Sequence, residues 1–198
     1  MNIPNKLTVS RLIMAPLFFI SFQLPVWVGP ELADLSSVLT IILWACTELT
    51  DLLDGQIARK RNLVTDLGKV MDPFADTFSR LTYFVCLSQA GIMPSWTFIL
   101  IMWREFSILF VRMLMMGKGK PVAANIWGKS KAVLYAVSGA AGVLYIAFSR
   151  WFAHATWLAS VSSVLTVIFI LAAIASVVSF LTYVKAIIRD GSLSTMTR

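Results

Sequence analysis

Four aspartates lie close together in the first half of the chain, at spacings that could bring their carboxylates to one point. Asp51 and Asp54 are three residues apart, and Asp72 and Asp76 are four apart, so each pair shares one face of a helix. Carboxylates this close together repel one another unless cations lie between them. Oxygen ligands of this kind suit Mg²⁺, Mn²⁺ or Ca²⁺, and we predict a site for two divalent cations.

Small and basic residues accompany the aspartates. Gly55 follows Asp54 directly, and Ala58 lies about one turn further along; side chains this small would leave a groove where a flat ligand can approach the helix backbone. When Gly55 and Ala58 are considered alone, close helix packing is the simpler explanation. Arg59 beside the groove could meet phosphate oxygens, or could extend into the cytosol as an ordinary interfacial cation.

Two helices must position these residues. One is expected from about Ser36 to Lys60, apolar in its first half and charged in its second, and the next from about Lys69 to Gln89, with the reverse order. The connection between them is short, so the helices should be antiparallel neighbours with all four carboxylates at one membrane boundary. Acidic side chains near a bilayer are costly and are functional candidates by default.

The composition places these helices in a membrane. Of 198 residues, 58% are hydrophobic and only 14% are charged, whereas soluble domains carry about 25% charged residues. A soluble globular domain and a disordered chain are therefore disfavoured, and so is a nucleic-acid module, because the basic residues are not gathered on a polar domain. We expect an all-α integral membrane protein, a single domain over residues 1–198.

Hydropathy predicts six transmembrane helices preceded by an N-terminal juxtamembrane helix. About 200 residues allow about six spans of ~20 residues. The juxtamembrane helix is expected over residues 3–11. Besides the two helices above, the spans are expected over residues 12–28, 96–116, 131–148 and 155–188.

The distribution of Lys and Arg predicts the orientation. Cytosolic loops are enriched in these residues, and Lys6, Arg11 and most other cations fall on the side that holds both termini, whereas the opposite loops hold only Arg150. We expect a multi-pass protein of the inner (cytoplasmic) membrane, with both termini and the aspartates facing the cytosol. Small residues in the last two spans predict close helix packing, and we also expect a homodimer.

The stretch from Asp51 to Asp76 resembles the signature of the CDP-alcohol phosphotransferases. That signature reads D-x-x-D-G-x-x-A-R, then eight residues, then G-x-x-x-D-x-x-x-D, and Gly68 supplies its second glycine. Eight fixed positions at about 5% usage each make a chance match of order 10⁻¹⁰ per start position. Six spans with cytosolic termini also fit this family.

The resemblance implies two divalent cations, Mg²⁺ or Mn²⁺, that bind the pyrophosphate of a CDP-linked donor and offset charge on the leaving phosphate. By position, Asp51, Asp54, Asp72 and Asp76 would be metal ligands. Asp76 would also be the general base, taking the proton of an acceptor hydroxyl that attacks the lipid-linked phosphorus and expels CMP. The residues along the CDP moiety would be Asp54, Gly55, Ala58, Arg59 and Gly68.

Beyond the signature, the chain most resembles the bacterial phosphatidylglycerophosphate synthases, whose donor is CDP-diacylglycerol and whose acceptor is glycerol 3-phosphate. The resemblance covers most of residues 1–135 and includes Asn2-Ile3-Pro4-Asn5, Leu7-Thr8, Arg11-Leu12, Asp72-Pro73-Phe74-Ala75-Asp76, Arg104-Glu105-Phe106 and Gly128-Lys129-Ser130-Lys131. Thr77, Ala132 and Tyr135 depart from the usual pattern near the expected acceptor pocket. Other acceptors therefore stay open, namely inositol phosphate, serine, choline or diacylglycerol, and phosphatidylglycerol as in cardiolipin synthesis.

Cations in the apolar helices favour a phosphorylated acceptor, because buried cations need anionic partners. Glu105 could satisfy one of them in an internal ion pair that only fastens helices, but the surplus of positive charge favours an anionic ligand. The lysines among them could instead meet anionic lipid headgroups. The candidates for the acceptor phosphate are Arg80, Arg104, Arg112, Lys129 and Lys131.

Two other functions compete with this interpretation. An intramembrane prenyltransferase also binds a diphosphate through Mg²⁺ and helix-borne aspartates, and a cation channel or transporter also needs an acidic site. Neither explains the spacing of Gly55, Ala58 and Arg59. A transporter further predicts acids near the bilayer midplane, whereas these flank a cytosolic loop.

Overall fold

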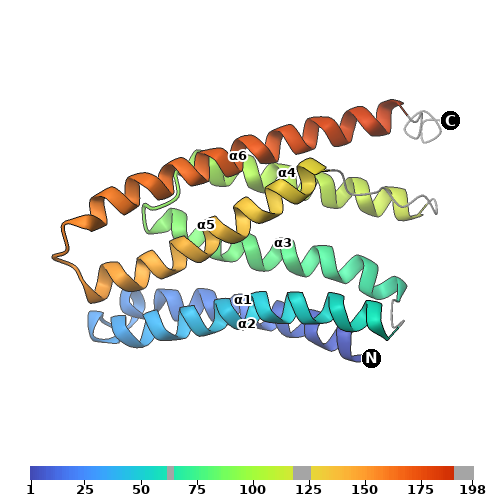
Figure 1. The fold of residues 1–198 in the computed structure, drawn as a ribbon. Coiled ribbons are helices and arrows are strands. Elements are labelled where there is room, and N and C mark those ends of the chain that lie inside the picture. The colour runs from blue at the N-terminus through green and yellow to red at the C-terminus, as the bar shows by residue number, and fades with distance from the viewer. Residues whose placement is uncertain (62–64, 118–125, 190–198) are drawn as a thin grey trace.

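The computed structural model describes residues 1–61, 65–117 and 126–189, and this part of the chain is a bundle of long helices without a strand (Figure 1). The start of α1 and the end of α6 lie at the same end of the bundle, which is also the end where α2 leads into α3. The elements are α1 (Ile3–Trp27), the 3₁₀ helix η1 (Pro30–Leu32), α2 (Ala33–Lys60), α3 (Asp66–Gln89), α4 (Ser95–Gly117), α5 (Ile126–Trp151) and α6 (Trp157–Arg189).

A separate juxtamembrane helix over residues 3–11 is wrong, because α1 runs without a break from Ile3 to Trp27. The side chain of Asn2 caps this helix by accepting the backbone N–H of Asn5 at 3.0 Å, and a proline in the first turn lacks only an N–H that would have no helical partner. Thr8 and Arg11 are buried. Part of the polar surface of this N-terminal segment therefore faces the interior of the protein, while Lys6 is exposed.

The other helices begin and end within five residues of the expected positions. The helix α3 begins at Asp66 rather than Lys69, three residues earlier than expected. Thr65 is its cap: the Thr65 hydroxyl accepts the backbone N–H of Gly68 at 3.0 Å, which satisfies one of the free donors of the first turn.

Four stretches of the described chain are long and apolar enough to cross a membrane, namely Ile3–Trp27, Pro30–Ala58, Lys131–Trp151 and Trp157–Lys185. The helices α3 and α4 are long enough but too charged. Every 18-residue stretch of α3 contains Asp72, Asp76 and Arg80, and every such stretch of α4 contains Arg104, Glu105 and Arg112. The charges of the candidate site are thus what separates these two helices from the other four.

Aromatic side chains and glycines hold α3, α5 and α6 together. The ring of Phe84 meets those of Tyr135 and Phe169 edge-on, with centroids 5.6 and 5.9 Å apart. A Cβ at Gly142 of α5 would lie 2.7 Å from a methyl carbon of Leu87 in α3. Small residues here allow close approach of helices within one chain, while large apolar side chains cover the outward faces.

Candidate active site

The four aspartates meet where α2 ends and α3 begins, and the guanidinium of Arg11 from α1 lies among them. Arg11 Nη2 is 2.6 Å from Asp54 Oδ2, and the same guanidinium pairs with Asp51, Asp72 and Asp76. Only 1% of the Arg11 side chain is exposed. The helical spacing and the short connection between α2 and α3 bring all four carboxylates to this one cation.

The aspartate cluster has the composition and spacing of a cation site. Asp51, Asp72 and Asp76 each offer a carboxylate oxygen, and these oxygens lie within 4.8 Å of one another. Carboxylate oxygens are ligands for Mg²⁺, Mn²⁺ and Ca²⁺. Four carboxylates and one guanidinium carry a formal charge of −4 + 1 = −3, so the cluster could take up further positive charge and could hold a divalent metal.

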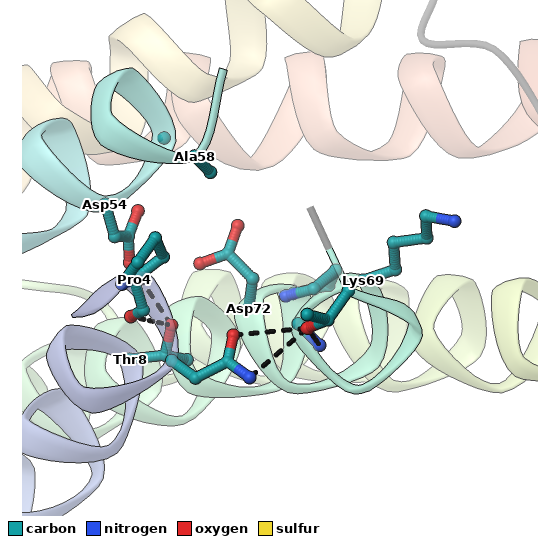
Figure 2. Close-up of a pocket in the computed structure, with 11 residues that line it drawn as sticks. Pro4, Thr8, Asp54, Ala58, Lys69 and Asp72 are labelled. Atoms are coloured by element: carbon teal, nitrogen blue, oxygen red, sulfur yellow. Dashed lines mark hydrogen bonds between the residues drawn. The ribbon is translucent and has the colours of Figure 1, made fainter. Parts of the chain in front are cut away.

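A cavity of about 260 Å³ opens on one side of the cluster, between α1, α2 and α3. In Figure 2 the carboxylates of Asp54 and Asp72 face this space, while the side chain of Lys69 extends away from both. Thr8 Oγ1 donates to Asp54 Oδ2 at 3.3 Å. The lining residues are Pro4, Asn5, Thr8, Asp54, Gly55, Ala58, Thr65, Gly68, Lys69, Asp72 and Pro73.

Glycine and alanine give this first cavity its shape. Gly55, Ala58 and Gly68 all line it. Three small residues of the sequence signature thus line the same cavity as two of the aspartates. A Cβ at Gly68 would lie 3.0 Å from Asn5 Oδ1 and 3.1 Å from the Thr65 hydroxyl. A larger residue there would displace the side chains of Asn5 and Thr65, which hydrogen-bond to each other at 3.2 Å, and so change the cavity.

A second cavity, of about 230 Å³, lies on the other side of the cluster between α3, α4, α5 and α6. Asp76 lines this cavity, whereas Asp54 and Asp72 line the first. Four cations and two acids line it, a formal surplus of 4 − 2 = +2. The cations are Arg80, Arg104, Arg112 and Lys131, and the acids are Asp76 and Glu105.

Glu105 fixes two of the four cations. Its Oε1 accepts from Lys131 Nζ at 2.5 Å and from Arg104 Nη1 at 2.9 Å, and Arg104 Nη2 donates to the Ser179 hydroxyl at 3.0 Å. The internal ion pair considered from the sequence thus exists, with Arg104 and Lys131 as partners of one carboxylate. Two positive charges share one negative charge, so the pairing leaves the surplus in place.

The residues that depart from the phosphatidylglycerophosphate synthase pattern lie at this second cavity. Thr77 and Ala132 line it. Tyr135 lies behind it, with Lys131 Nζ 4.7 Å and the Arg80 guanidinium carbon 5.7 Å from the centre of its ring. These departures therefore touch the cation-rich cavity and not the aspartate cluster.

One residue of the site, Arg11, was not predicted from the sequence, and the side chains of two predicted residues are not described by the structure. The side chains of Arg59 and Lys129 are among those that the structure does not describe. Arg11 was expected only among the cytosolic cations. The spacing of Pro4, Thr8 and Arg11 puts them on one face of a helix, and such a polar stripe beside apolar residues is the signal that could have revealed an interior role.

Comparisons with known proteins find a family and several relatives that this chain is similar to. The family model described as CDP-alcohol phosphatidyltransferase matches residues 1–188. The protein named CDP-diacylglycerol–glycerol-3-phosphate 3-phosphatidyltransferase of Bacillus subtilis (strain 168) is 39% identical over 144 residues, 69% of this chain and 75% of that protein. A protein of the same name from Treponema pallidum (strain Nichols) is 30% identical over 191 residues, 93% and 88% of the two chains.

A relative with a different name is also similar. The cardiolipin synthase (CMP-forming) of Streptomyces coelicolor (strain ATCC BAA-471 / A3(2) / M145) is 29% identical over 182 residues, covering 84% of this chain and 83% of that protein. This chain is therefore similar to relatives with two different names over most of its length.

Proposed function

Because this chain belongs to the CDP-alcohol phosphatidyltransferase family, we propose that it transfers the phosphatidyl group of CDP-diacylglycerol to glycerol 3-phosphate, releasing CMP and giving phosphatidylglycerol phosphate. The resemblance drawn from the sequence is confirmed, and the family is neither that of an intramembrane prenyltransferase nor that of a cation transporter. The observation that carries the proposal is the aspartate cluster between two cavities, one lined by the small residues of the signature and one rich in cations.

The first cavity is the proposed donor site. Asp51, Asp54, Asp72 and Asp76 would hold two divalent cations, Mg²⁺ or Mn²⁺, which supply a Lewis acid for the pyrophosphate of the donor. The CMP part would lie against the backbone at the small residues, where no side chain keeps a flat base away. Its contacts would be Gly55, Ala58, Arg59 and Gly68.

The second cavity is the proposed acceptor site. Its surplus of two positive charges suits the phosphate of glycerol 3-phosphate, and its four described cations are basic side chains that bind phosphate well. Asp76 is the aspartate of the cluster that lines this cavity, so it is placed to take the proton of the acceptor hydroxyl. The hydroxyl oxygen bonds to the phosphorus of the phosphatidyl group, the bond to the CMP oxygen breaks, and CMP leaves.

We further propose six membrane spans in one domain over residues 1–198, with both termini and the site on the cytosolic side. Four spans are apolar by composition, and α4 supports a fifth, since Trp103, Phe106 and Phe110 are exposed while Arg104 and Glu105 are buried. A helix that hides its charges and exposes aromatic side chains suits lipid. Reporter-protein fusions at both termini would test this topology, and activity of a periplasmic reporter at either would contradict it.

A homodimer is the remaining expectation for this protein. The described helices leave large apolar faces exposed, which lipid or a second copy could cover. Chemical cross-linking in membranes, followed by mass measurement of the detergent-solubilised protein, would distinguish a dimer from a monomer.

An acceptor panel tests the proposed function. Purified protein with CDP-diacylglycerol and Mg²⁺ or Mn²⁺ is incubated with glycerol 3-phosphate, inositol phosphate, serine, choline or phosphatidylglycerol, and CMP release is measured. For choline the reverse arrangement, CDP-choline with diacylglycerol, is also tried. We expect release with glycerol 3-phosphate and phosphatidylglycerol phosphate as the lipid product. Release with phosphatidylglycerol instead would assign cardiolipin synthesis. If none of the acceptors leads to CMP release, the enzymatic role of this site is overturned.

A further inference from the structure

Arg11 occupies the centre of the proposed metal site, yet the proposed reaction gives it no role. Its two terminal nitrogens divide the aspartates between them: Nη1 pairs with Asp51 and Asp76, and Nη2 pairs with Asp54 and Asp72. Each nitrogen therefore joins one aspartate of α2 to one aspartate of α3. A single side chain from α1 fastens both helices at the cluster.

The guanidinium is held in the cluster by its surroundings. Arg11 is 1% exposed, and its Nε has no hydrogen-bond partner in the described part of the chain, so the four carboxylates are what place it. Thr8, on the same helix as Arg11, donates to Asp54 at 3.3 Å. The Ser79 hydroxyl of α3 donates to the Arg11 carbonyl oxygen at 3.4 Å. An arginine cannot lose its charge in a protein, so this positive charge stays wherever the side chain stays.

A divalent cation in the cluster would meet the same oxygens that Arg11 uses. Asp51, Asp72 and Asp76 supply the oxygens that lie close enough to share an ion, and all three pair with Arg11. Two cations that share ligands repel each other, so the guanidinium must weaken the binding of the metal. By thermodynamic linkage the metal must weaken the contribution of the guanidinium by the same factor.

We propose that Arg11 is an internal counter-ion of the metal site, which holds the four carboxylates together when divalent cations are absent and competes with those cations when they bind. This inference rests on the metal site of the proposed function. Without Arg11, the four carboxylates would repel one another more strongly, although Arg80 shares a small cavity with Asp51 and Asp76, and α2 and α3 would be driven apart. With Arg11, the site is assembled before the metal arrives, at the expense of metal affinity.

The test compares Arg11→Gln with Lys6→Gln, which removes a positive charge from an exposed position of the same helix. Mn²⁺ binding is measured from the electron paramagnetic resonance signal of the free ion, and the unfolding temperature is measured in EDTA and in saturating Mn²⁺. We expect Arg11→Gln to bind Mn²⁺ at least about tenfold more tightly than wild type. Its unfolding temperature should fall by about 6 °C or more in EDTA and recover in Mn²⁺, and Lys6→Gln should change neither quantity.

A second variant keeps the proposal testable if Arg11→Gln does not fold without metal. Arg11→Lys retains the charge but not the two-nitrogen fork, so its Mn²⁺ affinity should lie between those of wild type and Arg11→Gln. In this case Arg11→Gln is purified in the presence of Mn²⁺. Equal or weaker Mn²⁺ binding by Arg11→Gln, or the same fall in unfolding temperature with and without Mn²⁺, would overturn the role of Arg11 alone. If neither wild type nor variant binds Mn²⁺, the metal site of the proposed function is overturned with it, whereas transfer in the acceptor panel is judged separately.

Discussion

Replacing Lys131 by Met tests whether the cation-rich cavity binds the acceptor. Lys131 lines that cavity and not the one with Asp54. Its Nζ lies 2.5 Å from Glu105 Oε1, and 4.7 Å from the ring centre of Tyr135. Methionine keeps most of the unbranched stem and removes the ammonium group with its charge and hydrogen bond, so the variant changes the electrostatics of the cavity more than its packing.

The size of the effect follows from the charges at the cavity. The substitution lowers the formal surplus from +2 to +1. A hydrogen bond to a charged group contributes about 1.5–3 kcal/mol, and each 1.36 kcal/mol is a factor of ten, so kcat/KM for glycerol 3-phosphate should fall about 10- to 150-fold. Breaking a buried ion pair usually costs about 3–5 kcal/mol of stability, but Glu105 keeps Arg104 at 2.9 Å, so the variant should fold at a smaller cost.

The assay measures initial rates of CMP release while each substrate is varied at saturation of the other. Lys185→Met is the matched control, because Lys185 is an exposed lysine near the end of α6. Lys131→Met should raise KM for glycerol 3-phosphate and leave KM for CDP-diacylglycerol within about twofold. A folded Lys131→Met variant with the acceptor kinetics of Lys185→Met would refute the acceptor role of the cavity. An equal change in the donor KM would show that its cations serve the donor instead.

Three further predictions concern the base, the metal and the packing of the bundle. Asp76→Asn should lower kcat about 100- to 10,000-fold while CDP-diacylglycerol still binds, as equilibrium binding can show; wild-type turnover would contradict the assignment of the base. EDTA should stop CMP release and Mg²⁺ or Mn²⁺ should restore it, so full activity in EDTA would contradict the metal site. Gly142→Ala places a Cβ 2.7 Å from Leu87 Cδ1 and should cost about 1–3 kcal/mol of stability; an unchanged unfolding temperature would show that Leu87 can move aside.

Much of the site could be predicted from the sequence because its information is local. Helical periodicity alone places Asp51 with Asp54, and Asp72 with Asp76, on shared faces, and a short connection brings the two faces together. Helical periodicity likewise predicts where the small residues of the signature lie relative to the aspartates. Their assignment to one cavity follows from their positions on α2 and α3, the two helices that the sequence had already paired.

The N-terminal segment shows where local reasoning fails. Its polarity was interpreted as that of a helix on the membrane surface, but residues 3–11 continue into α1, with Thr8 and Arg11 buried. A polar stripe on a helix can face water, headgroups or an interior site, and the sequence of that helix alone does not distinguish them. The neighbour decides, and here the neighbours are the aspartates of α2 and α3.

The sequence by itself determined all the long helices except the start of the first, the aspartate pairs and the family, because apolar runs, helical spacing and a motif of fixed residues are all properties of short stretches. Only the tertiary structure decided that Arg11 lies among the aspartates, and that Arg80, Arg104 and Lys131 from three helices surround one cavity with Glu105 between two of them. Apart from the pair of Arg104 with its neighbour Glu105, these contacts join residues far apart in the chain. They depend on how whole helices pack, and no periodicity within a single helix encodes that packing.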